Sequence, residues 1–418
     1  MIDSERLLGR IRALGRIGRT PEGALMRLAL TDSDREGRDA VVAWMKEAGM
    51  IVEVDAIGNI FGTWGSDAGD APVMIGSHLD TVVDAGIYDG AYGVLAGLEV
   101  VETLRDAGAT PVRPITVAAF TNEEGVRYTP DMMGSLVHAG GLALEEALAT
   151  VGTDGSTLGD ELRRIGYAGP LEPGTIRPYA FIELHIEQGP ILAGDGIPIG
   201  AVERLQGISW QRVTIRGEAN HAGTTPMRLR RDAGYAAARI VTFLHDLAHA
   251  SNGSTVATVG SMAFEPNAIN IIPAEATLTV DLRDADEVRL RSAEAALADF
   301  MARIADELGV GIEVERLARF SPVEFDERIV ARIEEAAAEL GVRARRMTSG
   351  AGHDAQMIAR IAPTAMIFVP SEGGISHSPR EHTSPEDLVT GANVLLGVVR
   401  RLAFDGLGGS GGGRRGSG

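Results

Sequence analysis

The sequence predicts an α/β fold in which a discontinuous larger domain, with a mostly parallel central sheet, carries an inserted α+β module. Apolar helices alternate with short, continuously apolar strands in the first half of the chain, as in sheets that are covered on both faces. This pattern changes near Gly207 and returns after Ser321. With 418 residues the chain also exceeds the size of one ordinary core, so two domains are expected.

The larger domain is expected to contain an early helix at 36–49, where apolar residues recur at helical spacing and a glycine ends the run. Strands are expected at 51–54 and 73–76, then an apolar helix at 90–107 and a continuously apolar strand at 115–121. Ligands of such sheets collect beyond the carboxyl ends of the strands. Polar residues that follow these strands are therefore the first candidates for a functional site.

The inserted module is expected to contain two helices and four strands. Their order is strand 208–216, helix 231–250, strand 255–262, strand 276–282, helix 287–308 and strand 311–317. This β-α-β-β-α-β order is that of a ferredoxin-like module. Val213 and Ile215 alternate with Thr214 and Arg216, which predicts an antiparallel sheet with one covered face.

After this module the α/β pattern resumes, with a helix at 326–340, a strand at 364–369 and a helix at 385–402. The predicted boundaries are 1–206 with 322–405 for the larger domain, 207–321 for the inserted domain and 406–418 for a tail. The tail is rich in glycine and is expected to be flexible.

The composition is that of a soluble globular protein, with 44% hydrophobic and 23% charged residues. A net charge of -19 argues against binding to nucleic acids or to anionic membranes. The absence of cysteine excludes disulfides and thiolate chemistry, which fits a cytoplasmic enzyme. The charged N-terminus indicates no signal peptide, and no apolar stretch approaches the roughly 20 residues that span a bilayer.

Acidic residues and histidines gather where the apolar strands end. His78 and Asp80 lie in S-H-L-D, Asp89 lies in Y-D-G at the start of a helix, and Glu123 and Glu124 follow the strand at 115–121. Carboxylates and imidazoles delivered from strand ends are what a divalent-metal hydrolase needs to activate water near neutral pH. Each motif alone has a structural alternative: a capped turn for H-x-D, a helix N-cap for Asp89, and a solvated loop for the two glutamates.

Two further histidines change this balance. His185 in E-L-H-I-E-Q-G follows an apolar run, and His382 lies in E-H-T-S near the C-terminal helix. Together with the strand-end residues they suffice for a two-metal site with one carboxylate left over as a base. Two metal ions roughly 3.5 Å apart can hold a shared water and polarise a carbonyl group.

The inserted module supplies candidates for substrate binding. His221 in N-H-A-G-T-T-P-M is a candidate donor to a tetrahedral oxyanion. Asn270 and Arg283 could clamp a substrate carboxylate, because guanidinium donors match a carboxylate bidentately. The alternative for Arg283 is a surface ion pair with Asp281 or Asp284.

The other histidines receive no metal role from the sequence. His245 and His249 lie four residues apart on a helix without the glutamate of an H-E-x-x-H motif, so a solvated helix surface is expected. His138 likewise has no neighbours of the kind found in the candidate motifs. His353 and His377 lie in glycine-rich loops, where either could line the pocket.

Eight ordered motifs, found between the first and last helices, resemble those of the M20 metallopeptidase-like amidohydrolases. They are S-H-L-D-T-V, Y-D-G-A-Y-G-V-L-A-G, T-N-E-E-G, E-L-H-I-E-Q-G-P-I-L, N-H-A-G-T-T-P-M, P-N-A-I-N-I-I-P, S-G-A-G-H-D-A and H-T-S. The similar branch is the hydantoinase/carbamoylase group, with N-carbamoyl-L-amino-acid hydrolases, β-ureidopropionases and allantoate amidohydrolases. Histidine in H-I-E-Q-G is typical of this branch, whereas Ile87 departs from the polar or basic residue that relatives often carry there.

The resemblance implies a role for each candidate residue. It implies Glu123 as general base, Asp80 as the residue that orients His78, and substrate contacts from Gln188, His221, Asn270 and Arg283. It implies five metal ligands: His78, Asp89, Glu124, His185 and His382, with Asp89 bridging two divalent ions. Zinc is the first expectation for these ions, with manganese, cobalt and nickel as alternatives.

The implied reaction is hydrolysis of the ureido C–N bond of an N-carbamoyl-L-amino acid to the amino acid, ammonia and carbon dioxide. Within the same class, the alternatives are allantoate, a β-ureidopropionase substrate, or an N-acyl amino acid or dipeptide. From another class, the alternative is a metal-binding protein without hydrolytic activity, against which the intact Glu123 argues. The inserted domain is expected to be a lid and the contact of a homodimer, with a small carboxylate-bearing substrate as the other partner.

Overall fold

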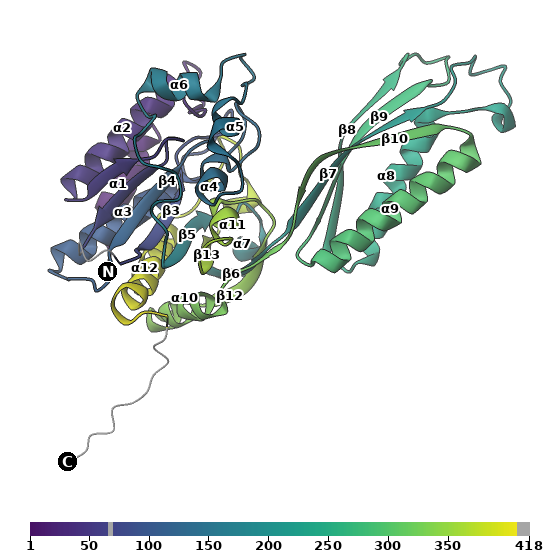
Figure 1. Cartoon of the computed structure of the whole chain (residues 1–418). Helices are drawn as coiled ribbons and strands as arrows, with labels where there is room; N and C mark the ends of the chain where they lie inside the picture. The colour runs from purple at the N-terminus through teal and green to yellow at the C-terminus, as the bar shows by residue number, and fades with distance from the viewer. Residues whose placement is uncertain (66–69, 408–418) are drawn as a thin grey trace. The chain divides into compact units, whose positions relative to one another are not determined.

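The computed structural model describes residues 1–65 and 70–407 and divides into two compact units (Figure 1). The larger unit comprises Met1–Glu203 and the chain from Phe325 onward, and the smaller unit is Arg204–Glu324. Most of the tail expected at 406–418 lies outside the described residues. Among the described residues, no helix has the length and apolar character that crossing a membrane requires.

The first sheet has nine strands, in the order β1-β2-β4-β3-β5-β13-β6-β11, and β12 pairs with β6. Its strands are β1 (Ile51–Val54), β2 (Ile60–Trp64), β3 (Val73–His78), β4 (Ile115–Phe120), β5 (Ala180–Ile186), β6 (Ile199–Leu205), β11 (Val323–Glu324), β12 (Ala344–Ser349) and β13 (Thr364–Val369). The central strands β4, β3, β5 and β13 are parallel, whereas β1, β2, β6 and β11 pair antiparallel. The predicted parallel centre is confirmed.

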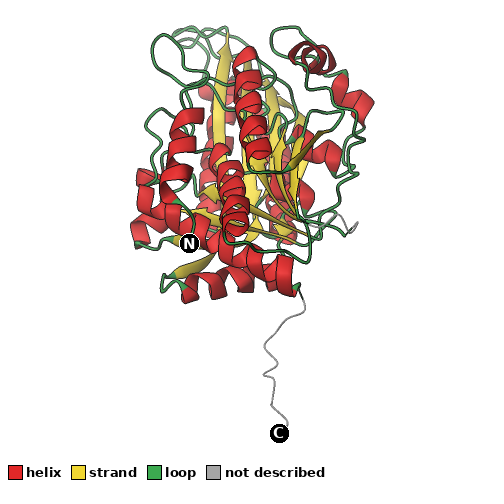
Figure 2. Cartoon of the chain, turned by 90° about the vertical axis from the view of Figure 1, so that its left-hand side faces the viewer, coloured by secondary structure: helices red, strands yellow, loops and turns green. Residues whose placement is uncertain are grey.

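Helices cover this sheet, as Figure 2 shows. The helices that the structure describes in this unit are α1 (Ser4–Leu14), α2 (Asp32–Glu47), α3 (Ala91–Asp106), α4 (Met133–His138), α5 (Leu144–Leu148), α6 (Leu158–Ile165), α7 (Ile191–Asp195), α10 (Glu327–Glu339), α11 (Asp354–Ile358) and α12 (Pro385–Arg400). Short 3-10 turns lie at Met227–Leu229 and Glu372–Gly374, and a π-helical turn lies at Arg401–Asp405. Every residue of β3, β4, β5 and β13 is buried, because helices pack on both sides of the central strands.

The smaller unit is a four-stranded antiparallel sheet with two helices. Its elements are β7 (Gly207–Arg216), α8 (Ala233–Ala250), β8 (Thr255–Glu265), β9 (Glu275–Asp284), α9 (Glu287–Leu308) and β10 (Gly311–Phe320), and the strand order is β10-β7-β9-β8. Val213 and Ile215 are buried against α8 and α9, whereas Thr214 and Arg216 are not. The alternation in the sequence thus marks the covered face correctly.

Candidate metal centre

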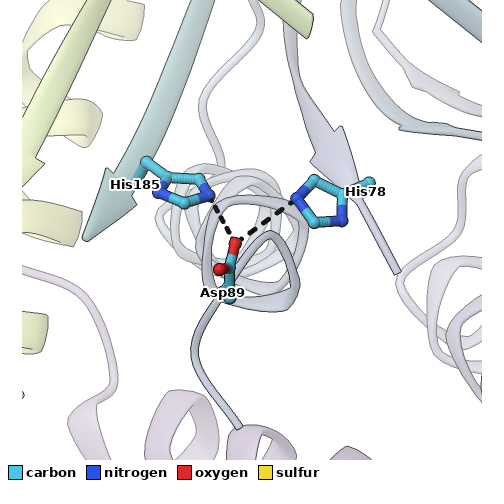
Figure 3. Close-up of side chains that lie close together, drawn as sticks. All are labelled: His78, Asp89 and His185. Carbon is cyan, nitrogen blue, oxygen red and sulfur yellow. Dashed lines mark ion pairs between the residues drawn. The ribbon is translucent and has the colours of Figure 1, made fainter. Parts of the chain in front are cut away.

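Two histidines and an aspartate meet at the carboxyl ends of neighbouring parallel strands (Figure 3). His78 ends β3, and His185 is the next-to-last residue of β5. Asp89 lies just before α3, and its Oδ1 is 3.5 Å from Nε2 of His78 and 3.0 Å from Nε2 of His185. All three side chains are buried. The carboxylate of Asp89 points between the two imidazoles, as Figure 3 shows.

Backbone carbonyls fix the orientation of both imidazoles. Nδ1 of His78 lies 2.9 Å from the carbonyl oxygen of Asp80, and Nδ1 of His185 lies 2.8 Å from that of Ile186. Because a carbonyl only accepts hydrogen bonds, each Nδ1 carries the proton and donates. Nε2 of each ring then lies on the side of Asp89, and Nε2 of His185 also accepts from the backbone amide of Gly90 at 3.1 Å. A ring with its Nδ1 held in this way keeps Nε2 for a metal ion.

Asp80 contacts His78 through a different group from the side chain that the sequence suggested. Its backbone carbonyl, and not its carboxylate, holds His78. The carboxylate instead accepts hydrogen bonds from the backbone amides of Glu123 and Glu124, each at 3.2 Å. The two amides lie in the turn that follows β4, where Asn122 has a φ of 56°. Because the carboxylate of Asp80 accepts from both amides, it positions the two adjacent glutamates.

The two glutamates point to different histidines. Oε2 of Glu123 lies 3.4 Å from Nε2 of His78, and Oε2 of Glu124 lies 3.5 Å from Nε2 of His377. Oε1 of Glu124 is buried and accepts no hydrogen bond from any described residue. A buried carboxylate oxygen without a donor is costly, and a cation at this place would remove the cost.

The fifth ligand expected from the sequence is also corrected. Nε2 of His377 lies 3.3 Å from Oδ2 of Asp89, whereas His382 faces the exposed Glu372 at 3.9 Å, with its own side chain about half exposed. Among the described residues, His382 belongs to no group of potential metal ligands, but His377 forms one with Asp89 and Glu124. The sequence placed two histidines five residues apart in one loop, and no local pattern distinguished them.

The potential ligands fall into overlapping groups. One group comprises His78, Asp89 and His185, and another comprises Asp89, Glu124 and His377, with the ligand atoms of each group within 4.8 Å of one another. Asp89 belongs to both groups through its two oxygens, as a bridging carboxylate would. Imidazole nitrogens and carboxylate oxygens are suitable ligands for zinc and for related divalent ions.

The electrostatics of the cluster also fit a cation. Burial, followed by the charge of Asp89, raises the pKa of the Glu124 carboxyl to about 8. Burial likewise raises the pKa of Glu123, and the hydrogen bond to Asp89 raises the pKa of His377 to about 9. Without a cation, Glu124 and His377 retain protons near neutral pH, and divalent cations would take the place of those protons.

The predicted substrate-binding residues lie in both units. In the larger unit, the side-chain amide of Gln188 donates to Oδ2 of Asp89 at 2.9 Å, so it touches the cluster. In the smaller unit, His221 is exposed and Nδ1 of its ring accepts from the amide of Gly223. The carbonyl of Asn270 accepts from the amide of Ala222, so the segments of His221 and Asn270 are neighbours. Arg283 on β9 pairs with Asp281 at 2.9 Å, which is the ion pair that the sequence left as its alternative.

Two buried residues near the cluster had no specific role in the sequence. The ring of His353 lies 4.5 Å from that of His185, and burial lowers its pKa well below the usual value, so this imidazole is neutral. The carboxylate of Glu381 accepts from the backbone amides of Tyr88 and Asp89. Only spacing could have indicated them: His353 lies in the same motif as Asp354, and Glu381 follows His377 by four residues.

The chain is similar to known proteins over almost its whole length. Residues 74–401 match Peptidase family M20/M25/M40. The chain is 41% identical to an N-carbamoyl-L-amino-acid amidohydrolase of Rhizobium meliloti, over 96% of this chain and 97% of that protein. It is 36% identical to an allantoate amidohydrolase of Escherichia coli (strain K12), over 94% of this chain and 96% of that protein. An amidase of the hydantoinase/carbamoylase family from Burkholderia multivorans has a similar crystal structure, with a TM-score of 0.92 and 45% identity over 96% of this chain and 98% of that one.

These similarities confirm the resemblance that the ordered motifs indicated. The relatives are amidohydrolases, and the side chains gathered around Asp89 are consistent with a metal-dependent enzyme of that kind. The chain belongs to peptidase family M20/M25/M40.

Proposed function

We propose that this protein hydrolyses the ureido C–N bond of an N-carbamoyl-L-amino acid and releases the amino acid, ammonia and carbon dioxide. The observation that carries the proposal is the buried Asp89, shared by two groups of potential metal ligands, with the carboxylate of Glu123 beside them. The similarity to N-carbamoyl-L-amino-acid amidohydrolases supports the choice of substrate.

We further propose two divalent ions as cofactors. His78, Asp89 and His185 would hold the first, and Asp89, Glu124 and His377 would hold the second. When bound, such ions polarise a carbonyl group and lower the pKa of water. Zinc suits this set of nitrogen and oxygen ligands, and manganese, cobalt and nickel are the alternatives.

Glu123 is the proposed general base. The carboxylate of Asp80 holds the backbone amide of Glu123. The carboxylate of Glu123 lies 3.4 Å from Nε2 of His78 and forms a further group of potential ligands with His78 and Glu124, but the two groups proposed for the ions are complete without it. Glu123 takes one proton from the attacking water as oxygen bonds to the carbamoyl carbon. It then passes this proton to the departing nitrogen as the C–N bond breaks, which leaves the amino acid and carbamic acid. Carbamic acid decomposes to ammonia and carbon dioxide.

The smaller unit is proposed to act as a ferredoxin-like lid that completes the substrate site. His221 would donate to the developing oxyanion, and Asn270 and Arg283 would hold the α-carboxylate of the substrate. In the structure Arg283 has an acidic partner in Asp281 on the same strand, so the substrate carboxylate would compete with Asp281 for the guanidinium.

Replacing Arg283 with alanine is expected to raise KM by about 10–100-fold, because a charge-assisted hydrogen-bond pair to the substrate is lost. Metal content should not change, since Arg283 lies in the smaller unit and the ligands lie in the larger one. Steady-state kinetics and elemental analysis measure both quantities. The matched control is Arg212→Ala, which removes an exposed arginine of β7 paired with Glu315 and should leave KM unchanged. A loss of metal in Arg283→Ala would show that this residue has been placed wrongly.

We also propose that the protein is a homodimer that associates through the smaller unit. β8 is an edge strand of the antiparallel sheet, and most of its residues are exposed or half-buried, including Val256 and Met262. An exposed edge strand offers unpaired backbone groups to a second copy.

The substrate is tested with the metal-loaded protein and a panel of N-carbamoyl-L-amino acids, their D-enantiomers, allantoate and N-acetyl amino acids. At least one N-carbamoyl-L-amino acid should exceed every other class in kcat/KM by about tenfold or more. A higher kcat/KM for allantoate or for an N-acetyl substrate would replace the proposed substrate. Full metal content without turnover of any compound would favour a non-hydrolytic protein instead.

A further inference from the structure

We infer that Glu381 is a positioning residue that fixes the spacing between Asp89 and His377 and thereby sets the affinity for the second metal ion. The inference rests on the metal ligands given under the proposed function. Asp89 and His377 are 288 positions apart in the chain, and both belong to loops rather than to strands, so neither is placed by the sheet itself. A separate contact must bring the two loops together.

The first half of this contact is made to the loop of Asp89. Oε1 of Glu381 accepts from the backbone amide of Tyr88 at 3.2 Å and from that of Asp89 at 3.3 Å. The helix that follows, α3, has Gly90 as its N-cap residue. Gly90 has a φ of 62°, which is not the usual backbone conformation of an N-cap, and no side chain caps this helix. The carboxylate of Glu381 holds the backbone just before this helix, and one of the two amides from which it accepts is that of the bridging residue itself.

The second half is made to the loop of His377. Oε2 of Glu381 accepts from the hydroxyl of Ser376 at 2.9 Å, and that hydroxyl also lies 3.4 Å from Oδ2 of Asp89. The amide of Glu381 donates to the carbonyl of Ser378 at 2.9 Å. His377, between these two serines, has a φ of 52°, a left-handed conformation that surrounding contacts must stabilise.

A glycine makes room for this carboxylate. A Cβ atom at position 86 would collide with the carboxylate and the Cβ of Glu381, so the glutamate packs against the bare backbone of Gly86. Glu381 is only 5% exposed, and its two oxygens receive three hydrogen bonds. Among the described residues it belongs to no group of potential metal ligands. Its contacts thus suit it to hold the ligands in place rather than to bind the ion.

The test is a calorimetric titration of metal-stripped protein with zinc. Glu381→Ala should weaken binding of one ion by about 10–100-fold, as is usual for residues that orient metal ligands, and should leave the other within a few fold. Glu381→Gln keeps an oxygen for the two amides and should recover most of the affinity. Gly86→Ala leaves Glu381 in the sequence but displaces its side chain, and should reproduce the loss seen in Glu381→Ala.

Two controls make the readout specific. Glu372→Ala removes an exposed glutamate from the same segment and should bind both ions as the parent does. His245 and His249 are exposed on α8 with ring centroids 4.1 Å apart and could take up added zinc, so every protein in the series carries His245→Ala. If Glu381→Ala does not fold, the comparison of Gly86→Ala with the parent decides.

The inference is overturned if Glu381→Ala and Gly86→Ala bind both ions with parent affinity, if both ions weaken equally, or if the parent binds one ion only. This test of Glu381 is independent of the proposed substrate, because zinc binding is measured without turnover. A parent protein that hydrolyses no carbamoyl compound, yet loses one ion in Glu381→Ala, would refute the proposed reaction and support this role of Glu381.

Discussion

Replacing Glu123 with glutamine is expected to lower kcat by about 10²–10⁴-fold, the usual contribution of a general base. The amide has nearly the same shape as the carboxylate but cannot take a proton from water at neutral pH. The backbone amide of residue 123 still donates to Asp80, and the ligand groups of His78, Asp89 and His185 and of Asp89, Glu124 and His377 remain complete. Turnover at saturating substrate, with metal content measured on the same sample, tests this expectation.

The matched control for this variant is Glu372→Gln, which makes the same chemical change at an exposed glutamate outside the cluster. Its kcat should equal that of the parent. If Glu123→Gln retained near-parent turnover with full metal content, Glu123 would not be the base. If it lost metal, the glutamate would be a ligand, and the division of roles between Glu123 and Glu124 would have to be reversed.

The long periodic elements could be predicted from the sequence because their patterns repeat enough times to be unambiguous. The helix expected at 287–308 is α9 (Glu287–Leu308), and the strand expected at 364–369 is β13 (Thr364–Val369). The short helices α7 and α11 have five residues each, less than two turns, so they give no readable period. The strand β12 was also missed, since its arginines pair with acidic side chains instead of alternating with apolar ones.

The same distinction applies to the candidate site. His78 and His185 lie at the ends of apolar strands, so the strand pattern alone places them at one edge of the sheet. His377 lies in a loop without a period, and only contacts with Asp89 and Glu124, remote in sequence, separate it from His382. Which group of Asp80 holds His78 could not be predicted from the sequence, for a related reason. Its carbonyl and its carboxylate can both hold an imidazole, and tertiary structure decides which one does.

Replacing His377 with alanine should abolish tight binding of the second metal ion, whereas replacing His382 with alanine should leave both ions bound. Loss of a ligand should weaken the affinity by more than the roughly 100-fold that accompanies loss of a residue orienting a ligand. The two variants delete the same imidazole from positions five residues apart in one loop, so each is the control for the other. Zinc titration of the metal-stripped proteins, with kcat/KM measured after loading, distinguishes them.

The structure explains why these two histidines should differ. Nε2 of His377 faces Oδ2 of Asp89 and Oε2 of Glu124 at 3.3 and 3.5 Å, so three ligand atoms already surround one place. Nε2 of His382 lies 3.9 Å from a carboxylate oxygen of Glu372, and that carboxylate is exposed to water, which screens its charge and competes for any ion. An ion lost from His382→Ala and kept by His377→Ala would mean that the loop rearranges when metal binds, so that the ligand is the histidine of E-H-T-S after all.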